Sequence, residues 1–156
     1  MDENTDPNVE LNEIEGEAQR PPQAPPGASV LDELPEATLA DLPEKLQAGV
    51  RQAGWTELMP VQSKAIPYLF AQRDMMIQSR TGSGKTGAYL LPILEMINPH
   101  QKNTQALVLV PTRELAHQVA GEAEILGKPA GVRSVAVYGG VGYSDQFAAF
   151  QAGRTW

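Results

Sequence analysis

The chain has 156 residues, enough for one domain of ordinary size, and a formal net charge of -7. Residues 1–44 contain 12 acidic residues and a single arginine, whereas residues 45–156 carry a net charge of +4, so the overall acidity does not exclude an anionic ligand. The absence of cysteine excludes disulfides and thiolate metal sites. The sequence shows no signal-peptide pattern and no apolar run near the roughly 20 residues that span a bilayer, and we therefore expect a soluble, cytoplasmic protein.

Residues 1–37 are expected to form a disordered acidic tail. They are rich in acidic residues and then in proline, with prolines at positions 21, 22, 25 and 26. Too few apolar residues are present to offset the entropy lost on ordering. A solvated extension is the simplest interpretation, and an arm that competes with nucleic acid for a basic groove is the alternative. Residues 38–156 then form the folded domain.

Two amphipathic helices are predicted before the first strand. Apolar residues recur at spacings of three and four over residues 39–53, and Gly54 ends this pattern. A second helical pattern covers residues 60–70 and contains Pro67, which predicts a kink. The short apolar run within residues 75–78 then predicts a strand.

A phosphate-binding loop follows this strand directly. Residues 79–86 read Ser-Arg-Thr-Gly-Ser-Gly-Lys-Thr, which meets the pattern G-x-x-x-x-G-K-[ST] except that Ser79 replaces the first glycine. Such a turn points backbone N–H groups inward at a helix start, which suits a polyphosphate. Lys85 would reach the β- and γ-phosphates, and the Thr86 hydroxyl would ligate Mg²⁺. A chance glycine-rich loop is the alternative. The candidate ligand-binding residues are Arg80, Thr81, Gly82, Ser83, Gly84, Lys85 and Thr86.

Strands and helices alternate in the rest of the chain. The patterns predict a helix over residues 87–97, a strand at 106–110, a helix over 114–126, a strand at 132–138 and a last helix over 144–150. The run at 106–110 is apolar on both faces, as in a central parallel strand. The order predicts an α/β fold with a parallel sheet flanked by helices and with the phosphate loop at the carboxyl edge of the sheet.

With these motifs in place, the chain resembles the DEAD-box ATP-dependent RNA helicases. The resemblance rests on residues 54–62, 79–86, 111–116 and 138–140, and it covers about residues 39–154. It implies an incomplete RecA-like P-loop domain that binds ATP with Mg²⁺. The chain departs from the family pattern at Leu58-Met59, where Pro-Thr is usual, at Leu39, where an aromatic residue is usual, and at Arg80, where glutamine is common.

The resemblance also implies an adenine site and an RNA site. Gln62 would read adenine, because an amide offers both a donor and an acceptor, and the Trp55 ring would stack on the base. The hexapeptide Pro-Thr-Arg-Glu-Leu-Ala at 111–116 would contact the RNA backbone through a hydroxyl, a guanidinium and helix-start N–H groups. Glycines at 139–140 let a phosphate approach the main chain, although simple turns are the alternative at both places. The implied RNA-binding residues are Pro111, Thr112, Arg113, Gly139 and Gly140.

Other segments of the family pattern do not occur in the 156 residues: Thr-Pro-Gly-Arg, Asp-Glu-Ala-Asp, Ser-Ala-Thr and a second RecA-like domain, which is expected downstream. The acidic pair would anchor Mg²⁺ and orient the attacking water, so we expect this chain to bind nucleotide without hydrolysing it. We also expect an open sheet edge to promote association. The alternatives are a non-catalytic nucleotide- or RNA-binding module and a small P-loop kinase, and the absence of a lid-like arginine cluster disfavours the kinase.

Overall fold

A computed structural model describes residues 33–101 and 103–140, together with residues 144, 146 and 148. The chain divides into two units, Met1–Glu33 and Leu34–Trp156, and only Glu33 of the first is described. The predicted acidic tail therefore lies outside the described residues up to residue 32. The fold below is that of the second unit.

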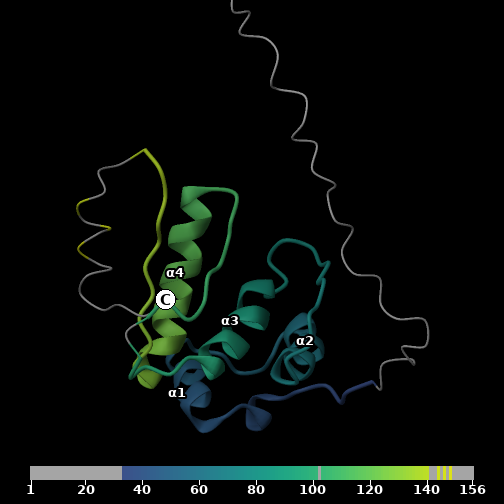
Figure 1. Ribbon diagram of the computed structural model, residues 1–156. Helices are drawn as coiled ribbons and strands as arrows, with labels where there is room; N and C mark the ends of the chain where they lie inside the picture. Colours follow the sequence, from purple (N-terminus) through teal and green to yellow (C-terminus); the bar gives the residue numbers. More distant parts are fainter. Residues whose placement is uncertain (1–32, 102, 141–143, 145, 147, 149–156) are drawn as a thin grey trace, which may run out of the picture. The chain divides into compact units, whose positions relative to one another are not determined.

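The described elements of this unit are helical (Figure 1). They are η1 (Leu39–Asp41), α1 (Glu44–Gln52), α2 (Pro60–Phe70), α3 (Lys85–Met96), α4 (Arg113–Gly127) and η2 (Lys128–Ala130). The prediction for α2 agrees at both ends, and those for α3 and α4 agree within two residues. Of the last predicted helix only Ser144, Gln146 and Ala148 are described, and all three are helical.

The single helix predicted over residues 39–53 is two elements in the structure. Pro43 lies between η1 and α1 with an extended ψ of 144°, which interrupts the helical backbone. Proline also lacks the N–H that would continue a helix from the preceding turn. The apolar periodicity is nevertheless real, because Leu42, Leu46 and Val50 are all buried.

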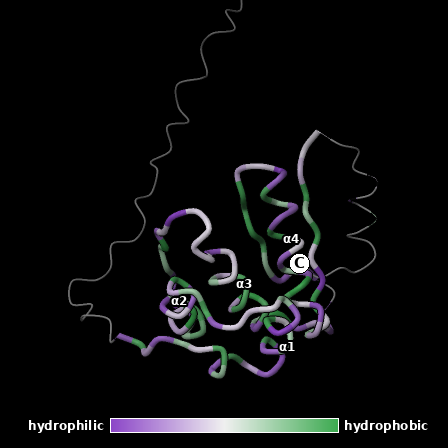
Figure 2. The backbone as a smooth tube through the Cα atoms, turned by 180° about the vertical axis from the view of Figure 1, so that it is seen from behind, coloured by the Kyte–Doolittle hydropathy of each residue, from purple (hydrophilic) through white to green (hydrophobic). Residues whose placement is uncertain are grey.

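The core forms where α1, α2 and α4 pack against α3. Leu46 of α1, Ile66 of α2, Leu91 and Leu94 of α3, and Leu126 of α4 are almost completely buried in one cluster. The most extensive contacts between helices are those of α2 with α3 and of α1 with α4. Coloured by hydropathy, the chain shows hydrophobic stretches both in these helices and in the extended segments beside α4 (Figure 2). Among the described residues, none of the helices has the length and apolar character needed to cross a membrane.

The predicted parallel sheet is not confirmed, because none of the described residues is assigned to a β-strand. Residues 75–78, 106–110 and 132–138 run as non-helical segments without a pairing ladder between them. A strand requires a hydrogen-bonded neighbour, and apolar character alone does not supply one. Residues 106–110 still alternate as a strand does, since Leu107 and Leu109 are 76% and 84% exposed whereas Ala106, Val108 and Val110 are half-buried.

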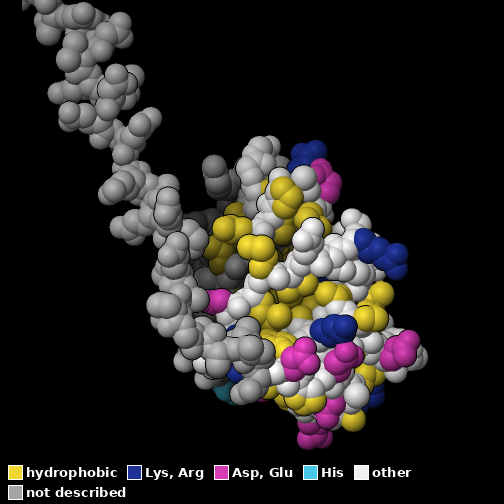
Figure 3. Space-filling view, turned by 90° about the vertical axis from the view of Figure 1, so that its right-hand side faces the viewer, with side chains coloured by type: hydrophobic (Ala, Val, Ile, Leu, Met, Phe, Trp, Pro, Cys, Tyr) yellow, Lys and Arg dark blue, Asp and Glu magenta, His cyan; other side chains and the backbone are white. Residues whose placement is uncertain are grey.

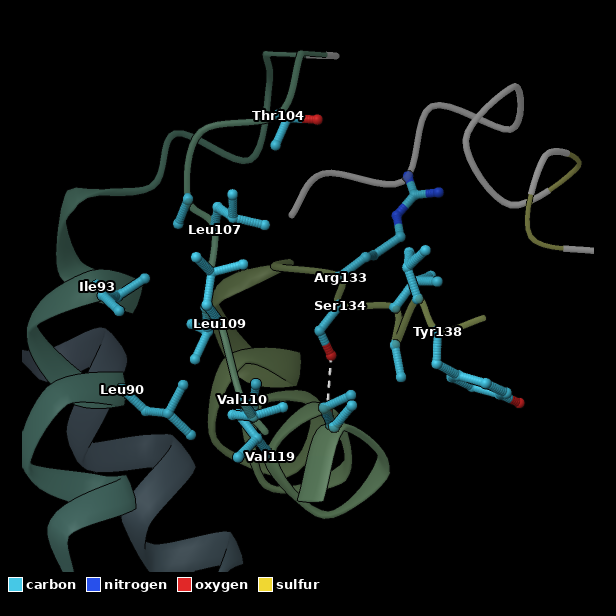
Figure 4. Close-up of a pocket in the computed structure, with 18 of the residues that line it drawn as sticks. Leu90, Ile93, Thr104, Leu107, Leu109, Val110, Val119, Arg133, Ser134 and Tyr138 are labelled. Atoms are coloured by element: carbon cyan, nitrogen blue, oxygen red, sulfur yellow. Dashed lines mark hydrogen bonds between the residues drawn. The ribbon is translucent and has the colours of Figure 1, made fainter. Parts of the chain in front are cut away.

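Residues 106–110 and 132–138 line a cavity of about 720 Å³ together with α3 and α4. Leu90 and Ile93 project from α3 toward this space, and Val119 projects from α4 (Figure 4). The Ser134 hydroxyl donates to the carbonyl of Ala120 on α4 at 2.8 Å, which ties the second segment to that helix. In the space-filling view, hydrophobic side chains gather on the face shown and charged side chains lie around them (Figure 3).

Candidate functional site

The phosphate loop leads directly into α3, as the sequence predicts. Gly82 and Gly84 have φ values of +77° and +89°, a left-handed conformation that residues with a Cβ rarely adopt. Lys85 is the first residue of α3, and its Nζ donates to the carbonyls of Ser79 at 2.6 Å and Arg80 at 2.7 Å. The ammonium group therefore lies over the main chain of the loop and makes the loop electropositive.

Further donors of the loop are suited to phosphate oxygens. The Ser83 hydroxyl is buried and has no hydrogen-bond partner among the described residues. The first N–H groups of an α-helix have no acceptor within the helix, and here they belong to the turn that carries Lys85 and Thr86. Together with the Lys85 ammonium and the half-buried Thr86 hydroxyl, these groups fit a polyphosphate with its bound cation. Arg80 and Thr81 are exposed beside them.

Gln62 contacts the phosphate loop although 22 residues separate it from Gly84. Its Oε1 accepts from the N–H of Met59 at 2.9 Å, and its Nε2 donates to the carbonyl of Gly84 at 3.1 Å. The side chain is only 2% exposed. Since Met59 offers a donor and Gly84 an acceptor, these two bonds fix which end of the amide is oxygen. One N–H and one lone pair of the amide remain for a further partner.

Trp55 lies on the same side of α3 as Gln62. Its ring packs against the hydrophobic core, and its main-chain N–H donates to the carbonyl of Val50 at 3.0 Å. A Cβ built on Gly87 would collide with the Trp55 ring and would lie 2.7 Å from Gln62 Nε2. The structure thus brings both residues predicted for adenine against the first turn of α3.

Two polar residues near the loop were not predicted from the sequence. Tyr89 follows Thr86 by three residues, a spacing that places side chains on one helix face, and Glu122 of α4 is half-buried nearby. Burial raises the pKa of Tyr89, while a hydrogen bond with the Thr86 side chain lowers it and the charge of Glu122 adds to the increase. Burial also raises the pKa of Glu122. The helical spacing could have identified Tyr89, whereas Glu122 depends on the packing of α4.

The residues predicted for RNA gather at the start of α4. Pro111, Thr112, Arg113 and Gly139 all line the cavity described above, and all are exposed. Thr112 caps α4, because its hydroxyl accepts from the N–H of Leu115 at 3.2 Å. Gly140 has a φ of +84°, outside the range that strand residues adopt.

One aromatic contact joins the segment before Gly139 to α4. The rings of Tyr138 and of His117 on α4 lie with their centroids 4.7 Å apart. On α4 itself, Arg113 Nε donates to the Glu114 carboxylate at 2.7 Å, and this bond lowers the pKa of Glu114. The Arg113 guanidinium keeps further N–H groups for another acceptor. This end of α4 therefore offers a hydroxyl, a guanidinium and an exposed glycine backbone.

Curated relatives match this chain over about a hundred residues. An ATP-dependent RNA helicase dhh1 from Aspergillus niger is 42% identical over 101 residues, which are 65% of this chain and 20% of that protein. The ATP-dependent RNA helicase DeaD from Haemophilus influenzae is 43% identical over 113 residues, which are 72% of this chain and 18% of that protein. The chain thus spans about a fifth of the length of these relatives.

Solved structures of DEAD-box helicases, whose domains are RecA-like, share the fold. The RNA helicase Prp28 from Chaetomium thermophilum bound to ADP has a TM-score of 0.68 at 36% identity, over 83% of this chain and 33% of that one. A DEAD box protein from Methanococcus jannaschii has a TM-score of 0.62 at 32% identity, over 74% of this chain and 32% of that one. The family model for the DEAD/DEAH box helicases matches residues 59–155, well over half of the chain. The chain therefore belongs to the DEAD/DEAH box helicase family.

Proposed function

We propose that residues 79–86 bind ATP with Mg²⁺ and that this site serves an ATP-dependent RNA helicase. The observation that carries the proposal is the position of Lys85, whose ammonium donates to the Ser79 and Arg80 carbonyls. The same loop holds the buried Ser83 hydroxyl, which has no hydrogen-bond partner among the described residues. An ammonium, a buried hydroxyl and free helix-start N–H groups are donors that a triphosphate would satisfy. Thr86 would hold the Mg²⁺, which on binding neutralises phosphate charge.

At the base end, Gln62 and Trp55 would bind adenine. The remaining N–H and lone pair of the Gln62 amide match the donor and acceptor that adenine presents. At the other end, Pro111, Thr112, Arg113, Gly139 and Gly140 would hold the RNA backbone, since hydroxyl, guanidinium and main-chain groups contact phosphate and sugar without reading sequence. We expect the whole protein to close two RecA-like domains on RNA.

Binding of ATP·Mg²⁺ to the full chain tests the nucleotide site. Lys85→Ala removes the charge over the loop, and we expect at least about a tenfold loss of affinity, which corresponds to ~1.4 kcal/mol. Unchanged affinity for ATP·Mg²⁺ in Lys85→Ala would contradict the proposal that this ammonium binds the phosphates. Arg51→Ala, an exposed cation on α1, is the matched control and should leave affinity unchanged.

Turnover separates binding from catalysis. The 156 residues contain no Asp-Glu-Ala-Asp tetrapeptide, and we propose that this chain binds ATP without hydrolysing it. Phosphate release measured with RNA present should stay at background. Steady release that disappears in Lys85→Ala would show that the chain is itself an ATPase.

A non-catalytic RNA-binding module is the second candidate, because the exposed groups at the start of α4 do not depend on the phosphate loop. Titration of labelled single-stranded RNA with and without ATP distinguishes the two. RNA binding that is indifferent to ATP favours the module. In either case Arg113→Ala should weaken binding and reduce its salt dependence, because one phosphate contact is lost.

A further inference from the structure

The first turn of α3 lies against three side chains. Trp55 and Met59 come from the segment before α2, and Gln62 comes from the first turn of α2. A Cβ on Gly84 would lie 2.6 Å from Met59 Sδ and 2.7 Å from Gln62 Nε2. A Cβ on Gly87 would collide with Trp55 Cη2 and would lie 3.2 Å from Trp55 Cζ2. These side chains therefore touch the main chain at both glycines, on either side of Lys85 and Thr86.

The position of Trp55 is set by α1 rather than by the loop. Gly54 reverses the chain after α1 with a φ of +76°, and the Trp55 N–H then bonds the carbonyl of Val50, a residue that is itself buried. The ring packs on the hydrophobic core from this anchored backbone. The start of α3 consequently rests on a ring whose place is already fixed by the core.

We propose that Trp55 is a positioning residue for the phosphate loop, in addition to any contact with the base. By packing on Gly87, the ring fixes the position of the first turn of α3 relative to α2, so that Gln62 can bond the Gly84 carbonyl. The same position directs Lys85 and the helix-start N–H groups toward a bound phosphate. This inference rests on the proposed function, because it concerns the same loop. It predicts that Trp55 also increases the affinity for phosphate ligands that have no base. Stacking on adenine would not change the affinity for such ligands.

Tripolyphosphate distinguishes the two roles because it carries the phosphates of ATP without adenine. We expect Trp55→Ala to weaken tripolyphosphate·Mg²⁺ by about tenfold and ATP·Mg²⁺ by at least as much, as measured by titration calorimetry on the full chain. A loss confined to ATP would overturn the inference and leave Trp55 as a stacking residue only. If the unaltered chain bound neither ligand, the proposed function would fail and this inference with it.

A double-mutant cycle tests the contact with Gly87. Gly87→Ala should weaken tripolyphosphate binding less in the Trp55→Phe background than in the original chain, because a phenyl ring lacks the indole atoms that reach Gly87. The clash of the new Cβ with Gln62 Nε2 is common to both backgrounds and cancels in the comparison. Equal losses in both backgrounds would contradict the coupling. Gly121→Ala is the matched control, since nothing lies within 4 Å of its Cβ, and it should not change binding.

Fluorescence gives a readout that needs no ligand and also detects variants that fail to fold. The sequence has two tryptophans, so Trp156→Phe leaves Trp55 as the single indole. Adding Gly87→Ala should move the ring from its half-buried site and shift its emission to longer wavelength, while far-ultraviolet circular dichroism keeps its helical signal. Emission that is unchanged by Gly87→Ala would show that the ring does not rest on this glycine.

Discussion

At the scale of single residues, Gln62 is the most deeply buried polar residue in the described part of the chain. Its amide satisfies the Met59 N–H and the Gly84 carbonyl inside a nearly closed site. Gln62→Leu keeps much of the volume but leaves both main-chain groups without their partner. We expect a loss of about 1–3 kcal/mol in the free energy of unfolding.

Urea denaturation followed by circular dichroism measures this loss. Gln118→Leu is the control, because Gln118 is exposed on α4 and such changes usually stay within about 0.5 kcal/mol. Equal stability of the two variants would mean that the Gln62 bonds contribute nothing net.

Glu122 gives the chain a pH dependence of unusual sign for a carboxylate. Burial raises its pKa above the ordinary value of 4.5, so the folded chain holds this proton more tightly than the unfolded chain does. Its contribution to stability is therefore greatest below pH 4.5 and is lost as the pH rises through the raised pKa. At pH 7 the half-buried charge is destabilising.

Glu122→Gln should therefore be more stable than the original chain at pH 7, and the difference should shrink as the pH falls through the raised pKa and be lost below about 4.5. Thermal unfolding across this range measures the effect. The exposed Glu124 is the matched position on the same helix, and Glu124→Gln should show a smaller difference at pH 7. If the stability gained by Glu122→Gln were smaller at pH 7 than at pH 4, the predicted direction of the pH dependence would be wrong.

The local parts of the candidate site could be predicted from the sequence, and the contacts between distant segments could not. The phosphate loop is contiguous, so its glycines and Lys85 are visible as a pattern. The role of Gln62 came from the resemblance, but its bond to Gly84 crosses 22 residues. Met59 was visible only as a departure from the family pattern, and its contact at Gly84 was not predicted. That contact and the position of Glu122 were missed because a methionine and a surface-type carboxylate carry no signal until the packing of α2 and α4 is known.

At the scale of elements, Gly49 determines how closely α1 approaches α4. A Cβ built on Gly49 would collide with the carbonyl of Leu126 near the end of α4. Because that atom belongs to the main chain, the helices themselves would have to separate. We expect Gly49→Ala to destabilise the chain by about 1–3 kcal/mol in spite of the better helix propensity of alanine.

Gly121→Ala on α4 provides the comparison. Its Cβ would meet nothing, so only the propensity gain of up to about 1 kcal/mol remains. Urea unfolding should thus change in opposite directions for two identical substitutions. A stabilising Gly49→Ala would show that α1 and α4 can move apart without loss.

Helices and extended segments differ in how far the sequence determines them. The bounds of α2, α3 and α4 follow from periodicity and from proline and glycine positions, which act within a few residues. The segment at 106–110 has the composition and the alternation of a strand, yet it lacks a pairing partner among the described residues. Composition selects an extended backbone, but only a neighbour at hydrogen-bonding distance makes it a strand.

At the scale of the whole molecule, this unpaired segment dominates the expected behaviour in solution. Leu107 and Leu109 are largely exposed, and residues 104–111 contain no charged side chain that would oppose pairing with another chain. An uncharged, apolar, extended edge is a template for association. Leu107 and Leu109 also line the cavity beside α3 and α4.

We therefore expect the chain to associate in a concentration-dependent way and Leu109→Lys to reduce this association by at least about tenfold, or ~1.4 kcal/mol. A lysine on the exposed side places charge against any added strand without disturbing the half-buried Val108 and Val110. Sedimentation equilibrium over a range of concentrations measures the constant. Ile125→Lys, at a 47% exposed apolar residue of α4, adds the same charge elsewhere and should change association much less. A chain that stays monomeric at high concentration would show that residues 106–110 are already covered. Equal effects of the two lysine substitutions would assign the association to net charge rather than to this segment.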